Sequence, residues 1–532
     1  MMAGTVARIL VAFAPIFLAA AAGKKMSTDG DKKTHRNDDV HIVVVGAGLA
    51  GMSAALEAVG MGAKVTLIEG EKNAGGNSAK ASSGISAAET DTQKRMGIND
   101  SIALFREDTL KAGDRVNDPQ LVDILVTNGK PSVEWLISHG VDLTDLNLCG
   151  GHSVPRTHWI PSPKEGKPIP VGFTTMSKLR NKFAAESAKQ PERVQALYES
   201  VVKDLLLDES GVTVLGVTLE NGRNIEADAV ILTTGGYSND HDEDSLLKEF
   251  AEEKMKYPTT NGHFARGQGV KMARRAGAQL SHMDYVQVHP TGFVDPKKPT
   301  ERTKFLAAEA LRGKGAILVN RKGKRFANEL GRRDYLTSMI DSHCERDEGV
   351  GHVAFMLMND PAVDAFGWPA FNFYWKVKGL FRRFDRLSDF AKEENVNYEE
   401  LFETMKVYNL AKDGRAADPV GKTVFPVAFD ATEPVYVAMV TPSIHYSMGG
   451  LKIDDSTRVL SLSNRPVQRL YAAGEVTAGV HGKNRLAGNS LLECVVFGRL
   501  AGRTAVKSSA AEKEKYAKNA AAANSAAKNV EL

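Results

Sequence analysis

Four short segments, far apart in the sequence, each place an imidazole or guanidinium group beside glycine or proline. They cover residues 287–291, 328–334, 445–450 and 481–490 and read QVHPT, NELGRRD, HYSMGG and HGKNRLAGNS. Guanidinium groups bind carboxylates and phosphates, and imidazole also transfers protons near neutral pH. Any one of these groups is more often structural than catalytic. Together the four segments predict a pocket for an anion.

A glycine-rich turn is the first element that could hold a ligand beside such a pocket. Residues 41–51 read HIVVVGAGLAG, in which four apolar residues predict a buried parallel strand and the glycines Gly46, Gly48 and Gly51 open a helix ending near Met61. The first glycine permits the tight turn, the second lets the backbone approach a pyrophosphate, and the third lets helix and strand pack. The N-terminus of the helix then directs its free N–H groups at the phosphates.

The segments that follow the turn strengthen this interpretation. A second strand, Lys64–Ile68, is followed by Glu69. An acidic residue about 20 residues after the glycine-rich turn binds a ribose hydroxyl. A loop of small residues, 75–84, comes next and would let backbone donors approach a flat ring such as isoalloxazine. The sequence therefore predicts a bound dinucleotide.

Length and composition limit the remaining possibilities. A chain of 532 residues predicts two or more domains, and a net charge of +3 gives no reason to expect nucleic acid or an anionic membrane as a partner. The three cysteines, Cys149, Cys344 and Cys494, match no haem, iron–sulfur or C-x-x-C spacing, so we expect no metal. From the residues alone, the chain is a flavin or nicotinamide protein with an anion pocket.

The four segments together with the glycine-rich turn resemble the flavoprotein of the fumarate reductase and succinate dehydrogenase family, and most closely its soluble fumarate reductase branch. The resemblance covers about residues 38–508, and the motifs HPT, NE…RRD, HYSMGG and HGKNRLAGNSLLE occur in order. It implies an α/β fold: a Rossmann-like FAD-binding domain with an inserted α+β capping domain that holds substrate. An aromatic-rich stretch that lacks the alternating strand–helix pattern marks the insertion.

We expect six parts along the chain. They are a signal-like segment at 1–22, a polar linker at 23–37, the FAD-binding domain at 38–283 and 447–510, the capping domain at 284–446, and a flexible tail at 511–532.

The resemblance implies roles for three groups of residues. FAD would be bound by Gly46, Ala47, Gly48, Gly51, Glu69, Gly76, Asn77, Ser78 and Gly84, with Glu475, Asn489, Ser490 and Leu491 closing over it. The substrate fumarate, which becomes succinate, would be held by His289, Thr291, His445 and Arg485. The proton donor would be Arg333, supplied through Glu309 and Arg312.

Three positions depart from the family's pattern. Members that attach FAD covalently use a histidine where this chain has Asn77, so we expect non-covalent FAD. Residues 266–269 read RGQG where the family usually has TGDG, and Ala308 replaces a threonine beside the relay acid. These last two departures leave the identity of the substrate and the rate open.

Two other functions remain alternatives on the sequence alone. One is a flavoenzyme of the same fold with another substrate, either an aspartate oxidase or a reductase of another unsaturated acid. The other is a non-catalytic subunit that carries flavin. For the reductase we expect reduced flavin (FADH2 or FMNH2) or a partner protein as electron donor rather than NADH, because no second G-x-G-x-x-G is present.

The N-terminus carries a targeting pattern. Arg8 precedes an apolar run, Ile9–Ala22, that ends in small residues and is too short to span a bilayer comfortably. The pattern predicts a signal peptide, a mature chain without a transmembrane span, and residence in the lumen of the endoplasmic reticulum. The alternatives are a mitochondrial location, or the cytosol if translation starts at Met26.

Overall fold

A six-stranded sheet carries the glycine-rich turn at its centre. In the computed structural model, which describes residues 37–530 apart from 83, 162 and 164–168, the strand order is β21-β22-β10-β1-β2-β6. The central strands pair in parallel, and β21 is an antiparallel edge. The strands are β1 (His41–Val45), β2 (Lys64–Ile68), β6 (Val194–Leu197), β10 (Ala229–Leu232), β21 (Arg458–Leu460) and β22 (Pro466–Ala472).

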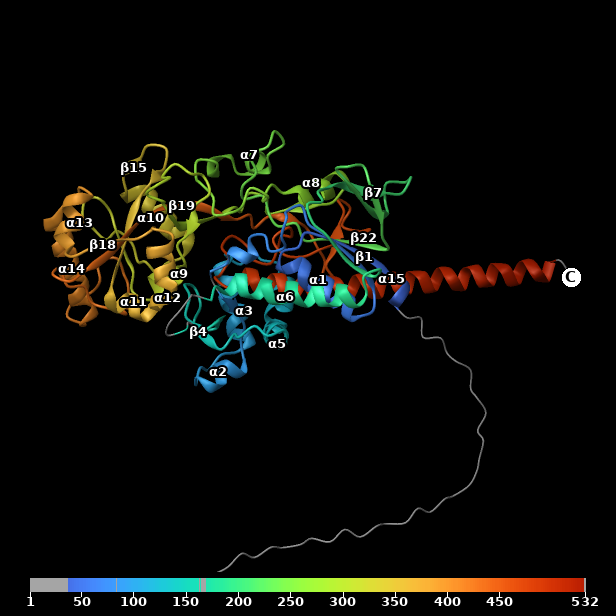
Figure 1. The fold of residues 1–532 in the computed structure, drawn as a ribbon, viewed down its shortest axis with the longest axis horizontal. Helices are drawn as coiled ribbons and strands as arrows, with labels where there is room; N and C mark the ends of the chain where they lie inside the picture. The colour runs from blue at the N-terminus through green and yellow to red at the C-terminus, as the bar shows by residue number, and fades with distance from the viewer. Residues whose placement is uncertain (1–36, 83, 162, 164–168, 531–532) are drawn as a thin grey trace, which may run out of the picture. The chain divides into compact units, whose positions relative to one another are not determined.

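Two helices from opposite ends of the chain pack together beside this sheet. Helix α1 (Leu49–Gly60) follows the glycine turn, and α15 (Asn489–Val530) runs along it, as Figure 1 shows. Arg499 and Arg503 of α15 donate to the Glu57 carboxylate of α1 at 2.8 and 2.9 Å. The C-terminal segment is therefore fixed against the start of the nucleotide-binding element.

The rest of this parallel-sheet part consists of short helices and small sheets. The helices are α2 (Asp91–Arg95), α3 (Ile102–Ala112), α4 (Pro119–Thr127), α5 (Gly129–Ser138), α6 (Val171–Lys189), α7 (Leu246–Phe250) and α8 (Gln268–Arg275). The strands are β3 (Ile85–Ser86), β4 (Asp145–Asn147), β5 (Thr157–Trp159), β7 (Val202–Leu207), β8 (Val214–Leu219), β9 (Asn224–Glu226), β11 (Leu280–Ser281) and β20 (Gly450–Leu451).

A second, antiparallel sheet organises the residues between these segments. Its order is β13-β12-β19-β17-β14, with β18 also pairing with β19. The strands of this antiparallel-sheet part are β12 (Gln287–Phe293), β13 (Phe305–Leu306), β14 (Ile317–Val319), β17 (Ala354–Asn359), β18 (Arg382–Phe384) and β19 (Val435–Tyr446), with a small pair, β15 (Arg346–Asp347) and β16 (Gly351–His352). Its helices are α9 (Glu309–Gly313), α10 (Arg333–His343), α11 (Asp360–Phe366), α12 (Trp368–Asn372), α13 (Leu387–Glu393) and α14 (Tyr398–Lys412).

Buried apolar side chains collect in two principal clusters that follow these sheets. One comes from residues 40–286 and 444–506, and the other from residues 293–440. All of them lie within a single compact unit that begins at Asn37. The exact boundaries given above, at 283/284 and 446/447, stay a prediction.

The structure differs from three local predictions of the sequence. The apolar runs on either side of Asn221–Gly222 predict a hairpin of Val212–Leu219 with Ala229–Leu232, but the turn joins β8 to β9, and β10 pairs with β1 and β22 instead. The helical pattern over residues 118–140 predicts one helix, whereas two helices, α4 and α5, form there. The tail from 511 onward continues α15 to Val530, because alanine and lysine favour helix.

The structure bears on only part of the targeting prediction. The signal-like segment and the linker up to residue 36 lie outside the described residues. Within the described part of the chain, no helix combines the length and apolar character needed to cross a bilayer.

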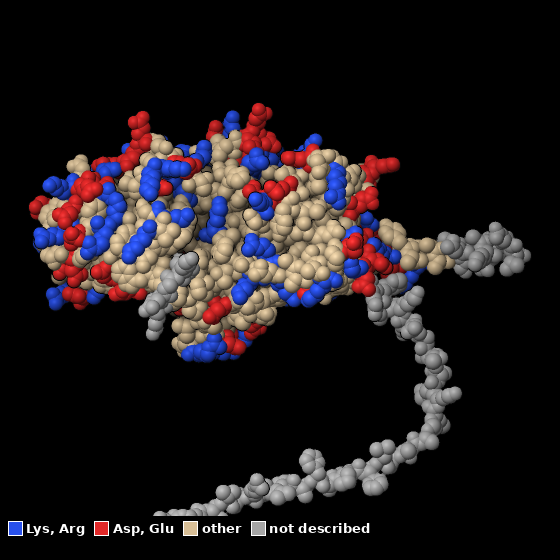
Figure 2. Space-filling view, in the orientation of Figure 1, with Lys and Arg blue, Asp and Glu red and all other residues tan. Residues whose placement is uncertain are grey.

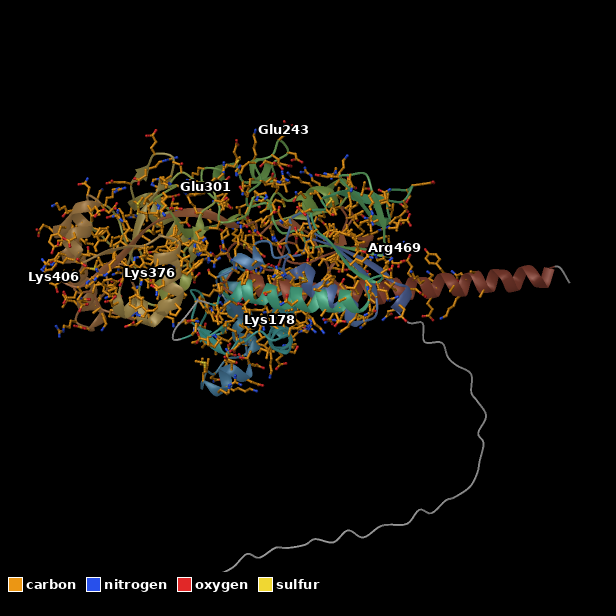
Figure 3. The ribbon with its side chains drawn as sticks, in the orientation of Figure 1. Lys178, Glu243, Glu301, Lys376, Lys406 and Arg469 are labelled. Carbon is orange, nitrogen blue, oxygen red and sulfur yellow. The ribbon has the colours of Figure 1, made fainter. Side chains whose placement is uncertain are left out.

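Charged side chains of both signs are mixed over the surface. Figure 2 shows Lys and Arg interspersed with Asp and Glu on the face in view, in keeping with the small net charge. The labelled Lys178 on α6, Lys376 in η4 (Phe373–Val377) and Lys406 on α14 are exposed (Figure 3).

Candidate active site

A cavity of about 930 Å³ opens where the glycine turn, the small-residue loop and the C-terminal segment meet. Such a volume is typical of cofactor and ligand sites. Of the predicted cofactor residues, those that line it are Gly46, Gly48, Glu69, Gly76, Asn77, Ser78, Gly84, Glu475, Ser490 and Leu491. Ala47, Gly51 and Asn489 do not line it. The Asn489 amide instead donates to Thr109 Oγ1 at 3.3 Å.

The glycines of the turn serve different purposes. A Cβ at Gly46 would lie 2.5 Å from the Thr233 carbonyl oxygen, and one at Gly51 only 1.8 Å from the Gly46 carbonyl oxygen. Gly48 faces the cavity, because a Cβ there would meet no protein atom closer than Ser78 Oγ at 3.6 Å. The empty space at Gly48, at the start of α1, suits a phosphate group.

Two carboxylates at the cavity fit the ends of a dinucleotide. Glu69, at the end of β2, accepts from the backbone N–H groups of Ala47 and Glu71 at 2.8 and 3.0 Å, and burial raises its pKa. Glu475 accepts from the Ser447 N–H at 2.9 Å, and burial raises its pKa to about 7. The cavity walls therefore fit FAD. The open space at Gly48 would hold its pyrophosphate, and Glu69 would bind its ribose.

Asn77 is held by hydrogen bonds from a neighbouring loop. Its amide donates to Asn261 Oδ1 at 2.5 Å, and its oxygen accepts from the Gly262 N–H at 3.1 Å. Asn261 in turn donates to the His445 carbonyl oxygen at 3.1 Å. A carboxamide is no nucleophile, so this position offers no group for a covalent flavin bond.

Two histidines lie together beside the cavity, and of the two only His445 lines it. Strands β12 and β19 pair in antiparallel register and place the His289 and His445 rings with centroids 5.2 Å apart. Burial, and then the Arg333 charge, lower the pKa of both imidazoles well below the usual value. His289 Nδ1 accepts from the Thr291 N–H at 3.2 Å, so its proton resides on Nε2. Both are neutral groups at pH 7.

Thr291 supports His289 and does not line the cavity. Its hydroxyl donates to the Ala307 carbonyl oxygen at 3.2 Å, and its N–H fixes the His289 tautomer. The structure thus places it behind His289 and not among the cavity-lining residues. The direct contact between Thr291 and substrate that the resemblance implies stays a prediction.

Three buried guanidinium groups approach the histidines. Arg485 lines the cavity, and burial and the charge of Arg333 lower its pKa to about 10, so it stays protonated at pH 7. Arg333, the first residue of α10, donates to Gln287 Oε1 at 2.7 Å and to Glu309 Oε2 at 3.3 Å. Arg312 of α9 donates to the Glu329 carbonyl oxygen, and its Nε and Nη2 have no partner among the described residues.

Glu309 is the carboxylate that joins this cluster. Its Oε1 accepts from the Gly150 N–H at 2.7 Å, and its Oε2 faces Arg333. Burial works to raise the pKa of Glu309, but the charges of Arg333 and Arg312 outweigh burial and hold that pKa below its ordinary value. Of the three guanidinium groups, only Arg333 forms an ion pair with a carboxylate among the described residues. Glu329 acts on Arg312, and Glu475 and Glu493 act on Arg485, only through their more distant charges. Guanidinium groups that lack a direct carboxylate partner inside the protein are suited to binding a dianion.

Arg485 rests on an aromatic ring. Its guanidinium lies 4.6 Å from the centroid of the Tyr446 ring, and the Tyr446 hydroxyl donates to Glu493 Oε2. His481 Nε2 lies 3.0 Å from the same oxygen. In the described part of the chain no carboxylate forms a hydrogen bond or ion pair with Arg485, so its outer face is available to a ligand.

The structure brings the predicted site together and adds residues that the sequence did not single out. His289, His445, Arg333, Arg485, Glu309 and Arg312 form one cluster. Gln287, Tyr446 and Gly150 support it. Gln287 and Tyr446 stand inside two of the four motif segments, at 287–291 and 445–450, whereas Gly150 lies in none of them. Each acts through a neighbour that lies far away in sequence.

Comparisons with known proteins identify the family of the chain. Residues 41–491 match a family model described as an FAD binding domain. The chain is 37% identical to a fumarate reductase of Schizosaccharomyces pombe over 477 residues, covering 88% of this chain and 90% of that one. Fumarate reductase 1 of Saccharomyces cerevisiae is 38% identical over 472 residues, covering 86% and 97%.

A solved structure shows the same fold. The open conformation of a flavocytochrome c3 fumarate reductase superposes with a TM-score of 0.70 at 31% identity, covering 92% of this chain and 83% of that chain. This match confirms the predicted α/β fold, with a Rossmann-like FAD-binding domain and an inserted capping domain.

Proposed function

The chain belongs to the FAD-binding fumarate reductase family of oxidoreductases, and from that premise we propose that it reduces fumarate to succinate with non-covalently bound FAD. The observation that carries the proposal is the set of three buried guanidinium groups beside the cavity, of which only Arg333 forms an ion pair with a carboxylate among the described residues. A dicarboxylate would supply the missing partners, and a substrate with an added ammonium group, such as aspartate, would bind less well.

The chain's residues supply binding and a proton. Arg485, with the neutral imidazoles of His289 and His445, would hold the two carboxylates, and the guanidinium can bind one of them through two parallel hydrogen bonds. When bound, FAD in its reduced form supplies a hydride to one alkene carbon. The alkene electron pair then takes a proton at the other carbon, so that fumarate gains one hydride and one proton.

We assign proton donation to Arg333 and its recharging to Glu309. The Glu309 carboxylate lies 3.3 Å from Arg333 Nη2, close enough to pass a proton to Arg333 directly. Because its lowered pKa leaves Glu309 ionised at rest, it first takes that proton from Arg312, whose charge is one cause of the lowered pKa. An arginine has a very high ordinary pKa, so it gives up its proton only to the strongly basic carbon that hydride addition creates.

The electron donor that we propose is reduced free flavin, FADH2 or FMNH2, or a partner protein. Support comes from the sequence, which holds one dinucleotide fingerprint, at Gly46–Gly51.

Competition of succinate and malonate with fumarate separates this function from an aspartate oxidase. A non-catalytic subunit would give no turnover at all.

Replacing Arg485 and Arg333 by alanine should have different effects. Arg485→Ala removes a carboxylate clamp, and the loss of a charged hydrogen bond, about 1.5–3 kcal/mol, should raise KM for fumarate about 10- to 150-fold. Arg333→Ala removes the proton donor and should abolish turnover while fumarate still binds. Steady-state kinetics with equilibrium binding measures both. Equal losses of binding alone in the two variants would contradict the assignment.

FAD should leave the protein on denaturation. Asn77 has no nucleophilic atom, and its amide is engaged by Asn261 and Gly262. After precipitation with acid, all yellow colour is expected in the supernatant, as measured by absorbance. Colour that stays with the precipitated chain would show a covalent bond.

We also propose that the protein enters the secretory route and works in the lumen of the endoplasmic reticulum. Support comes from the Ile9–Ala22 run and from the N-x-S triplet at Asn99, a weak glycosylation signal. Imaging of the tagged full-length chain should show a reticular signal, with a mobility change on deglycosylation. A mitochondrial signal without that change would refute the proposal, and a diffuse signal would indicate initiation at Met26.

A further inference from the structure

One turn of the parallel-sheet part touches both the proton relay and the substrate clamp. In the turn 149–153, the Gly150 N–H donates to Glu309 Oε1 at 2.7 Å. Two residues later, His152 Nε2 lies 2.9 Å from the Ala487 carbonyl oxygen, in the segment that carries Arg485. Because His152 Nδ1 faces the Arg156 guanidinium at 3.4 Å, it must be an acceptor and Nε2 the donor.

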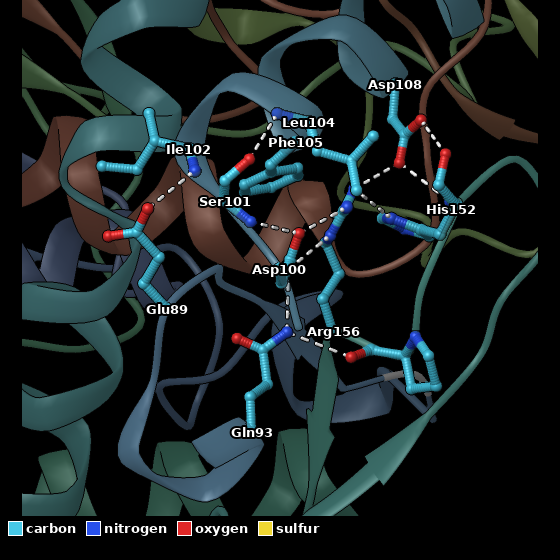
Figure 4. Close-up of polar contacts among 12 residues, drawn as sticks. Glu89, Gln93, Asp100, Ser101, Ile102, Leu104, Phe105, Asp108, His152 and Arg156 are labelled. Carbon is cyan, nitrogen blue, oxygen red and sulfur yellow. Dashed lines mark hydrogen bonds and ion pairs between the residues drawn. The ribbon is translucent and has the colours of Figure 1, made fainter. Parts of the chain in front are cut away.

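The turn is anchored by buried charges, shown in Figure 4. Arg156 is fully buried and donates to both oxygens of Asp100, at 2.9 and 3.0 Å, and to Asp108 at 2.5 Å. Ser153 of the turn donates to Asp108 through its N–H and its hydroxyl, at 2.8 and 2.6 Å. Breaking a buried pair of this kind is strongly destabilising, so the turn is held in one position.

The contact with Gly150 decides how Glu309 lies. One carboxylate oxygen meets the Gly150 N–H and the other meets Arg333, so the two donors select a single orientation of the side chain. Glu309 belongs to the antiparallel-sheet part, whereas Gly150 belongs to the anchored turn. The relay carboxylate is therefore positioned from outside its own sheet.

Space also requires a glycine at this position. A Cβ at Gly150 would lie 2.9 Å from Glu309 Oε1 and 3.3 Å from the Leu330 carbonyl oxygen. The φ angle of Gly150 is not in the left-handed region, so the backbone itself would accept alanine. What alanine would displace is the end of a flexible side chain, the Glu309 carboxylate.

We propose that Gly150 is a positioning residue of the proton relay, whose N–H and missing side chain hold the Glu309 carboxylate toward Arg333. The inference rests on the proposed function and extends it to a residue that touches neither substrate nor cofactor.

The test is Gly150→Ala, with Gly313→Ala as its matched control. Gly313 ends the same helix as Glu309, and a Cβ there would meet only the Leu148 carbonyl oxygen, at an ordinary 3.7 Å. Purified holoenzyme is assayed anaerobically with fumarate and reduced methyl viologen. Gly150→Ala should lower kcat by about 10- to 100-fold, since a misplacement of about 1 Å costs up to about 100-fold, while KM stays close to wild type. Gly313→Ala should behave as wild type.

A double-mutant cycle separates positioning from general damage. In a Glu309→Gln background, Gly150→Ala should lower kcat no further, because the carboxylate that it displaces is already gone. Glu309→Asp gives a second background, which keeps the charge and leaves room for the added methyl. There too Gly150→Ala should cost little. Flavin content and Tm are measured for every variant.

The outcomes point in different directions. An active wild type with unchanged kcat in Gly150→Ala would overturn the inference alone. The same holds if the loss multiplies with Glu309→Gln, or if Gly313→Ala loses as much as Gly150→Ala. A wild-type holoenzyme without fumarate turnover would instead overturn the proposed function, and the inference with it.

Discussion

The burial of three guanidinium groups, Arg312, Arg333 and Arg485, is the constraint on which the rest of the structure depends. Charges removed from water are costly unless a partner offsets them, and among the described residues only Arg333 has a carboxylate, that of Glu309, as a direct ion-pair partner. The protein therefore needs rigid surroundings to keep the guanidiniums together before a ligand arrives. Preorganisation of this kind makes a clamp effective, because no reorganisation is needed when the substrate binds.

Buried charge networks supply that rigidity from both parts of the chain. On the antiparallel-sheet side, Arg312 donates to the Glu329 carbonyl oxygen, and the Glu329 carboxylate is held by Arg325 and by Lys422 at 2.8 and 3.0 Å. On the parallel-sheet side, Arg156 between two aspartates fixes the turn at Gly150. Glu309 contacts both networks, because it accepts from Gly150 of the parallel-sheet part and from Arg333 of the antiparallel-sheet part. The geometry of the proton relay therefore depends on both parts of the chain.

Much of this could be predicted from the sequence, and what could not has physical causes. The strand, turn and helix from His41 to Gly60 follow from local periodicity and glycine spacing, and they form as expected. The partner of β8 was misjudged, because an Asn-Gly turn indicates a reversal but not which strand completes it. The supporting roles of Gln287, Tyr446 and Gly150 were missed, although the first two stand inside motif segments, because these roles arise from contacts with residues between 46 and 159 positions away along the chain.

Anaerobic turnover of the purified holoenzyme with fumarate tests the central claim most directly. With reduced methyl viologen as the electron source, we expect one succinate for each fumarate consumed, competition by malonate, and much weaker turnover of monomethyl fumarate. The monoester lacks one of the two charges that the buried guanidiniums would bind. Equal turnover of the diacid and the monoester, or none of the diacid, would contradict the account.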